Sequence, residues 1–257
     1  MYYRLQNYNC SRFLFSDEPT GGIGLIRIDK YLCDNAGLSR SEAKKAVLSS
    51  KVTINNIPVK RCEAKLLEGT DTVTLNGEPV TYEKYSYYML NKPTGYVSAN
   101  SDSKEKTVMD LLSSEKKKNL SCVGRLDKDT TGLLLITNDG ELLHRLISPN
   151  KNVYKDYLVT IVKPLTDKDI KALEEGVDIN DPTPTKPAKV KVIDDGNIVL
   201  SITEGRFHQV KRMLIAVGNA VVKLKRLSEG PLKLDESLSE GSYRKLTAEE
   251  IDLLKTL

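Results

Sequence analysis

Apolar residues after Gly24 recur first at helical spacing. Ile28, Tyr31 and Leu32 occupy positions i, i+3 and i+4, which predicts one apolar face of a short helix. Ser39 and Glu42 have the spacing of a capping box, so a second helix is expected to begin between them. These two segments together predict a helix–turn–helix.

Short runs of alternating apolar and polar residues follow the two helices, as half-buried strands require. Asn55-Asn56 and Asn76-Gly77 are turn dipeptides between such runs and predict two tight hairpins. The helices and hairpins predict a small unit over residues 25–80, followed by a linker over residues 81–86.

A larger α+β domain is predicted over residues 87–257. Apolar or alternating runs predict strands over residues 87–90, 121–124, 133–137, 155–162, 189–194, 198–203 and 221–226. Helical spacing and capping residues predict helices over residues 138–149, 166–176, 206–218 and 247–257. Strands outnumber helices and often follow one another directly, so the sheet should be mainly antiparallel and flanked by helices and loops.

Residues 1–24 show neither a helical period nor a strand alternation. Thr20-Gly21-Gly22 can be encoded with the bases of a bacterial ribosome-binding site, and Leu25 can be encoded by TTG, a bacterial start codon. One hypothesis is that translation naturally starts at Leu25. The alternative is a genuine N-terminal tail.

The composition is that of an ordinary globular protein, with 39% hydrophobic and 29% charged residues. Residues 25–65 hold nine Lys or Arg and four Asp or Glu, so the net charge of this segment, 9 − 4 = +5, exceeds that of the whole chain, +4. This excess favours a polyanionic partner such as RNA, although a solvated charged face has the same composition. The four cysteines and two histidines lack the spacing of a metal site. No apolar run approaches the roughly 18 residues of a membrane span, so a cytoplasmic protein is expected.

The segment GRLDKDTTG, residues 124–132, places Asp127 and Asp129 in a loop before an apolar run. It is either a polar turn or a loop in which one carboxylate is a reagent. Two carboxylates acting as acid and base, as in a glycosidase, would be a third reading, but residues two apart in a loop rarely converge on one bond. Asp129 is therefore expected to cap the loop with Thr130 or Thr131, and the two flanking glycines are expected to act as hinges.

Three segments in this order resemble the motifs of the RNA pseudouridine synthases. GRLDKDTTGLLLIT resembles their R-L-D-x-x-T-x-G loop, YKDYLVT their second motif and EGRFHQVKRM their third. The basic segment RIDKYLCDNAGLSRSEAKKAVLSSKVTINN resembles the S4 RNA-binding domain. The third motif and the short C-terminus are most similar to the branch that modifies small-subunit (16S) rRNA, with the large-subunit (23S) branch as the alternative.

This resemblance implies site-specific isomerisation of uridine to pseudouridine in ribosomal RNA. It identifies Asp127 as the catalytic carboxylate, acting at the sugar as nucleophile or base, and Lys211 as its paired cation. Tyr157 would stack on the target base, although its spacing alone favours packing in a strand core. The substrate pocket is expected to include Arg125 and Leu224 as well. Phosphate contacts are expected from the S4-like unit, at Arg27, Lys30, Arg40, Ser41, Lys44 and Lys45.

The implied reaction is a redox-neutral isomerisation, so no cofactor and no metal are expected. The expected partner of this monomer is ribosomal RNA, free or within an assembling small ribosomal subunit, with no membrane and no nucleotide cofactor. His208, in the third motif, is expected to bind RNA or to cap a helix. Two other functions remain: an S4-type RNA-binding protein without catalysis, and a nucleoside or glycoside hydrolase using Asp127 with Asp129.

Overall fold

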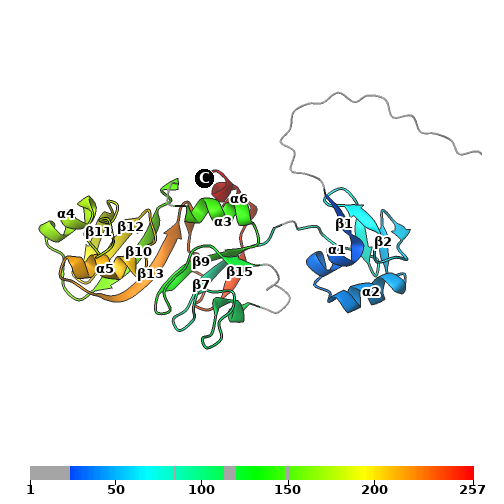
Figure 1. Ribbon diagram of the computed structural model, residues 1–257, viewed down its shortest axis with the longest axis horizontal. Coiled ribbons are helices and arrows are strands. Elements are labelled where there is room, and N and C mark those ends of the chain that lie inside the picture. The colour runs from blue at the N-terminus through cyan, green and yellow to red at the C-terminus, as the bar shows by residue number, and fades with distance from the viewer. Residues whose placement is uncertain (1–23, 84, 113–119, 149–150) are drawn as a thin grey trace, which may run out of the picture. The chain divides into compact units, whose positions relative to one another are not determined.

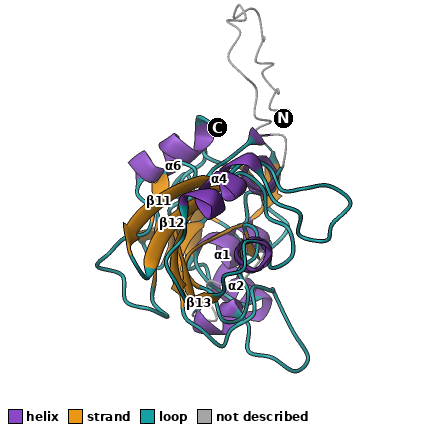
Figure 2. Cartoon of the chain, turned by 90° about the vertical axis from the view of Figure 1, so that its left-hand side faces the viewer, coloured by secondary structure: helices purple, strands orange, loops and turns teal. Residues whose placement is uncertain are grey.

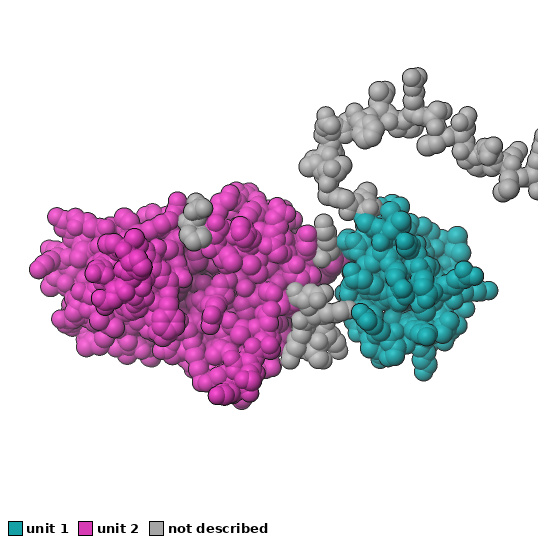
Figure 3. Space-filling model, in the orientation of Figure 1, with its two compact units in different colours: residues 1–82 teal, residues 83–257 magenta. Residues whose placement is uncertain are grey.

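The computed structural model describes residues 24–83, 85–112, 120–148 and 151–257. The chain divides into two compact units, residues 1–82 and residues 83–257 (Figure 3). The boundary falls within the segment 81–86 that we expected to be a linker. The hypothesis of a start at Leu25 concerns residues 1–24, and all of these except Gly24 lie outside the described range.

Unit 1 combines two helices with short strands (Figure 1). Its helices are α1 (Ile28–Asn35) and α2 (Arg40–Leu48), and the predicted capping box of α2 is present. Strand β1 pairs with β4, and a four-stranded sheet has the order β3-β2-β5-β6. The strand bounds are β1 Leu25–Arg27, β2 Val52–Ile54, β3 Ile57–Pro58, β4 Lys65–Leu67, β5 Val73–Leu75 and β6 Glu78–Pro79.

The two predicted hairpins of unit 1 are confirmed. Asn55, Asn56, Asn76 and Gly77 all have positive φ, which is the conformation that tight hairpin turns require. The pairing of β1 with β4 was not predicted, because three-residue strands leave almost no alternation to detect.

Unit 2 is organised around one nine-stranded sheet. Its main order is β11-β12-β10-β13-β9-β7-β15, with β14 added to β13 and β8 added to β9. In the described part of this sheet only β13 and β9 run parallel, so the predicted α+β fold with a mainly antiparallel sheet is confirmed. The strand bounds are β7 Tyr87–Lys92, β8 Ser121–Cys122, β9 Thr131–Thr137, β10 Lys155–Ile161, β11 Lys189–Asp194, β12 Asn197–Ile202, β13 Val221–Glu229, β14 Leu232–Lys233 and β15 Tyr243–Lys245.

Strands β7 and β9 are buried on both faces, which explains their continuous apolar runs. One face packs with α3 (Gly140–Ile147) and α6 (Ala248–Lys255). The core on the other face extends to α4 (Asp167–Glu175) and α5 (Gln209–Ala216). Figures 1 and 2 show α4 beside β11 and β12. This second face carries the candidate site.

Three details differ from the sequence predictions. The apolar pairs Leu142-Leu143 and Leu146-Ile147 predict one face of α3, but Ile147 is 43% exposed, so that face consists of the buried Leu142 and Leu146 with Leu143 partly buried. The run over residues 121–124 gives only the two-residue strand β8. Helix α5 begins at Gln209 rather than at residue 206, because His208 adopts a left-handed conformation. Among the described residues, no helix combines the length and apolarity needed to cross a bilayer.

Candidate active site

The loop that carries Asp127 is held by a buried lysine that the motifs did not single out. Lys92 ends β7, and its side chain is fully buried. Burial lowers the pKa of Lys92 to about 8, and the nearby Asp129 and Asp127 carboxylates only partly offset that effect. Its ammonium lies within hydrogen-bond distance of four main-chain carbonyl oxygens, which share its three N–H donors: those of Thr130 (2.8 Å), Asp127 (3.0 Å), Pro93 (3.1 Å) and Lys128 (3.3 Å).

The segment after β7 holds the same loop at two further points. The Ser98 hydroxyl donates to the Leu126 carbonyl (2.9 Å) and accepts from the Leu126 amide (3.1 Å). The Gly95 amide donates to the carbonyl of Lys128 (2.8 Å). Together with Lys92, these bonds fix the main chain on both sides of Asp127, as a catalytic side chain requires.

Gly132, at the end of the loop, is a close-packing position rather than the expected hinge. It has φ +100° and pairs with Arg226 where β9 and β13 run parallel. A Cβ atom there would lie 2.3 Å from the Arg226 carbonyl oxygen. Only glycine therefore allows the loop to enter β9 directly against β13.

Lys211 on α5 bridges the two loop carboxylates. Its Nζ lies 2.9 Å from Asp127 Oδ2 and 2.6 Å from Asp129 Oδ1. Burial alone would lower the pKa of Lys211, but the hydrogen bonds to Asp129 and Asp127 outweigh burial and raise it. The same contact acts in the opposite direction on its partner: the hydrogen bond from Lys211 lowers the pKa of Asp129. The Lys211 ammonium therefore lies between the carboxylates of Asp127 and Asp129.

The expectation that Asp129 caps the loop through Thr130 or Thr131 is wrong. The Asp129 side chain is 71% exposed and turns to Lys211, whereas Asp127 is only 26% exposed. The Thr130 hydroxyl is buried beside the pocket and has no hydrogen-bond partner among the described residues. The two carboxylates thus share one cation but differ in burial, which favours Asp127 as the group facing an enclosed substrate.

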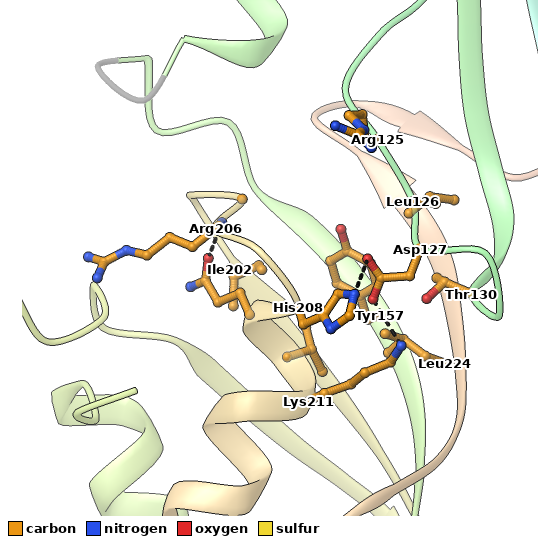
Figure 4. A pocket seen from close by; sticks show the side chains of 13 residues that line it. Arg125, Leu126, Asp127, Thr130, Tyr157, Ile202, Arg206, His208, Lys211 and Leu224 are labelled. Atoms are coloured by element: carbon orange, nitrogen blue, oxygen red, sulfur yellow. Dashed lines mark hydrogen bonds and ion pairs between the residues drawn. The ribbon is translucent and has the colours of Figure 1, made fainter. Parts of the chain in front are cut away.

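Tyr157 and Leu224 form the floor of the pocket. Tyr157 on β10 and Leu224 on β13 are each 7% exposed and line the same cavity as Asp127 (Figure 4). Burial raises the pKa of Tyr157, against the smaller opposing effect of the Arg226 charge, so the phenol stays protonated. A flat, mostly apolar floor beside a carboxylate paired with an ammonium suits a planar base attached to a polar sugar.

A buried charged cluster behind Tyr157 was not foreseen. Arg226 is 1% exposed, and its Nε donates to the Leu133 carbonyl (2.7 Å). Its Nη2 lies 3.4 Å from Glu229 Oε2, and Lys155 Nζ lies 4.0 Å from Glu229 Oε1. Burial would lower the pKa of Arg226, but the Glu229 carboxylate raises it. The available signal was strand alternation, because Arg226 follows Leu224 by two positions.

His208 approaches Asp127 from the start of α5. Its backbone is left-handed, with φ 47° and ψ 35°, and its Nε2 lies 3.7 Å from Asp127 Oδ1. It occupies the predicted N-cap position of α5, but its side chain makes no capping hydrogen bond. Figure 4 shows His208, just before α5, and Lys211, within α5, both reaching toward Asp127, while Arg125 lies apart from them. Arg125 is exposed and makes no ion pair with any residue that the structure describes.

The predicted phosphate-binding residues of unit 1 divide into two groups. Arg27 is bound to Asp29, with Nη2 2.7 Å from Oδ2, and Lys30 lies 4.0 Å from an aspartate one turn later. The Ser41 hydroxyl lies 3.0 Å from that of Ser39. The remaining three, on α2, are exposed and without an ion pair in the described part of the chain: Arg40, Lys44 and Lys45. The basic side chains of α2 are therefore less neutralised by nearby carboxylates than those of Arg27 and Lys30.

These features define an α+β protein with an ion-paired carboxylate above a pocket floored by a buried tyrosine. Residues 86–216 match the family model described as RNA pseudouridylate synthase. The chain belongs to this family.

Similar proteins cover nearly the same length. An uncharacterized RNA pseudouridine synthase of Bacillus subtilis is 48% identical over 234 residues, which span 89% of this chain and 98% of that protein. Ribosomal small subunit pseudouridine synthase A is 44% identical in Haemophilus influenzae (89% and 99% covered) and 42% identical in Escherichia coli (88% and 98%). A crystal structure of a pseudouridylate synthase aligns with a TM-score of 0.64 at 43% identity, covering 89% of this chain and 99% of the other.

Proposed function

We propose that this protein converts specific uridines of small-subunit (16S) ribosomal RNA to pseudouridine. The observation that carries the proposal is the Asp127–Lys211 pair, with its 2.9 Å contact, in the same pocket as Tyr157. Support for the substrate comes from relatives of 42–44% identity that are named ribosomal small subunit pseudouridine synthase A. Large-subunit (23S) rRNA is the alternative target.

Asp127 is assigned the step at the sugar. In a nucleophilic route its carboxylate oxygen attacks C1′, and the electrons of the C1′–N1 bond leave with the uracil. The uracil turns until C5 faces C1′, and C5 then attacks C1′ and returns the bonding electrons to the carboxylate. C5 finally loses its proton to a base, and N1 gains one. A route in which Asp127 removes a proton from the sugar places the same carboxylate at the same point.

Lys211 and Tyr157 are assigned supporting roles in this chemistry. A carboxylate must stay ionised after the entering base displaces water, and the adjacent Lys211 ammonium favours that form. The Tyr157 ring and the Leu224 side chain hold the uracil from below, which confines its rotation to the plane of the pocket. The Tyr157 hydroxyl takes part in the proton transfer at C5.

Unit 1 is assigned the task of holding the RNA as an S4-like domain. The target uridine has to leave its stack before it reaches Asp127, so contacts elsewhere on the RNA must offset the unstacking. Exposed cations at Arg40, Lys44 and Lys45 supply phosphate contacts that do not depend on sequence. We place this work in the cytoplasm, on free rRNA or an assembling small subunit, by a monomeric protein.

The proposal is tested with rRNA that carries tritium at uridine C5. Isomerisation replaces the C5–H bond with the C5–C1′ bond, so it releases tritium to water. We expect release from small-subunit transcripts or precursor particles and none from Asp127→Asn. Asp129→Asn is the matched control, since it also removes one charge next to Lys211, and we expect it to remain active. Retained tritium on every RNA would contradict the proposal, and a dead Asp129→Asn would contradict the choice of carboxylate.

The same experiment separates the other functions. A binding protein without catalysis would bind the RNA and retain all tritium. A hydrolase would release free uracil or sugar, which chromatography of the soluble fraction detects. Tritium release from 23S but not from 16S rRNA would identify large-subunit rRNA as the substrate.

A further inference from the structure

Phe207 exposes an aromatic ring at the edge of the candidate active site. It is 76% exposed, the highest value among the large hydrophobic residues that the structure describes. The chain has three phenylalanines, twelve tyrosines and no tryptophan, and the other exposed aromatic residues that the structure describes, Tyr85 and Tyr154, are only 36% and 39% exposed. A single exposed apolar residue is common and means little alone. The neighbouring residues on both sides, Arg206 and His208, line the Asp127 pocket, and this position gives the exposure its interest.

The Phe207 ring is stacked on the imidazole of His208. Their centroids are 3.8 Å apart and their planes differ by 18°. The Nε2 atom of the same imidazole lies 3.7 Å from Asp127 Oδ1. The stack therefore connects solvent to the proposed reactive carboxylate, and its outermost ring keeps one face uncovered.

The backbone around this stack is fixed in a costly conformation. His208 adopts positive φ, which is uncommon for residues other than glycine and tends to occur at functional sites. The Phe207 carbonyl accepts a bond from Arg212 Nη1 (3.1 Å), and the Arg206 amide donates to Gln209 Oε1 (2.9 Å). The Arg206 guanidinium also donates to the Thr183 carbonyl (2.6 Å). These bonds fix the backbone that carries Phe207, and the ring itself rests on the His208 imidazole.

We propose that Phe207 is a stacking platform for an unpaired nucleobase next to the target uridine. The inference rests on the proposed function. Flipping the uridine removes a stacking partner from its neighbours in the RNA. A pre-positioned aromatic face replaces that partner, and stacking of one base on an aromatic side chain contributes about 1–3 kcal/mol. A single flat ring beside a pocket for a planar base fits a nucleobase better than it fits a protein surface, which would need a wider apolar patch.

The first test compares the unchanged protein with four variants on the same tritiated rRNA. We expect Phe207→Ala and Phe207→Leu to raise KM by about 5-fold to 100-fold, as loss of one stacked base predicts, with kcat nearly unchanged. Phe207→Tyr should restore the original KM. Ile215→Ala is the matched control, because Ile215 is 64% exposed on α5 but offers no ring. An unchanged KM in Phe207→Ala, or an equal loss in Ile215→Ala, would overturn the proposal.

The second test asks whether the ring acts through a base. After the modified uridine is mapped, its 5′ and 3′ neighbours are replaced in turn by an abasic nucleotide. With the unchanged protein, the abasic nucleotide at one of the two neighbours should weaken RNA binding as much as Phe207→Ala does. On that abasic RNA, Phe207→Ala should cause no further loss of binding. Additive losses at both neighbours would overturn the platform. If the unchanged protein releases no tritium from any RNA, the proposed function fails, and the platform fails with it. Normal release without an effect of Phe207 removes the platform alone.

Discussion

At the scale of single residues, the charge of the pocket depends on Lys211. It is the only cation within 4 Å of either loop carboxylate, apart from an imidazole, in the part of the chain described. Replacement by methionine keeps most of the side-chain volume and leaves two facing carboxylates without their cation. We expect Lys211→Met to lower kcat/KM by about 100-fold or more, as loss of a charge-assisted contact does.

Lys211→Arg separates charge from shape in the same measurement. The guanidinium keeps the positive charge and adds a planar fork that suits carboxylates. We expect it to recover most of the lost kcat/KM in tritium-release assays. Equal activities for the methionine and arginine variants would show that the charge at this position does not matter.

The buried Lys92 should make both stability and activity change as the pH rises above neutrality. Its pKa of about 8 in the folded protein lies below the ordinary value of 10.5 because the side chain is buried. The folding penalty of the buried charge is therefore fully present below pH 8. It is relieved as pH rises toward 10.5, where the unfolded chain still holds the proton.

Activity should move in the opposite direction to this stability term. A neutral amine can donate to at most two of the four carbonyls that the ammonium holds, so the Asp127 loop loosens as pH rises through about 8. We expect single-turnover rates to fall across this pH range while the urea midpoint does not fall with them. Lys92→Met should be slow and flat over the same range. A wild-type rate that keeps rising past pH 9 would contradict this role.

The sequence identified the residues whose roles follow from motifs but not those that depend on burial. Asp127, Tyr157 and Lys211 belong to the three motifs, and the structure brings them into one pocket. Lys92 and Arg226 were missed because long charged side chains are normally expected at the surface, although alternation places Arg226 on the same face as the buried Leu224. Their burial depends on partners that only the fold brings near, namely main-chain carbonyls around Lys92 and the Glu229 carboxylate beside Arg226.

At the scale of elements, the junction of β9 and β13 connects the fold to the loop. Gly132 lets the loop enter the sheet beside Arg226, and any Cβ there would lie within 3.0 Å of the Arg226 backbone. We expect Gly132→Ala to reduce the free energy of unfolding by about 3 kcal/mol or more, through strain at positive φ and lost pairing. Urea unfolding followed by circular dichroism measures the change.

Gly140→Ala provides the matched control. Gly140 begins α3, and a Cβ atom added there would meet no other atom within 4 Å among the described residues. Alanine favours a helix over glycine by up to about 1 kcal/mol, so this variant should be neutral or more stable. Similar losses in both alanine variants would contradict the packing explanation for Gly132.

Element types were predictable where local signals were strong. The capping boxes at Ser39, Thr166 and Thr247 and the asparagine turns are all present, because each depends on residues within four positions. Strands β1, β14 and β15 were missed, since two or three residues cannot show a period and are fixed by distant partners. The late start of α5 depends on His208, whose imidazole approaches a loop eighty residues earlier in the chain.

At the scale of the whole molecule, the two compact units divide the proposed work between binding and chemistry. In the proposed division, exposed cations on α2 supply RNA affinity, whereas the Asp127 pocket is lined only by residues of unit 2. Phosphate contacts release counterions, so each one adds to the salt dependence of binding. Changes on α2 should therefore alter RNA affinity and its salt slope without altering the chemical step.

The double variant Lys44→Ala with Lys45→Ala tests this division. We expect weaker RNA binding and a salt slope flatter by about one to two units, because up to two phosphate contacts are lost. Tritium release at saturating RNA should stay near the original rate. Lys168→Ala with Lys171→Ala removes the same charge from α4 in unit 2, which distinguishes a local contact from a change in net charge. An equal slope change in both double variants, or none in the first, would remove α2 from the RNA-binding surface.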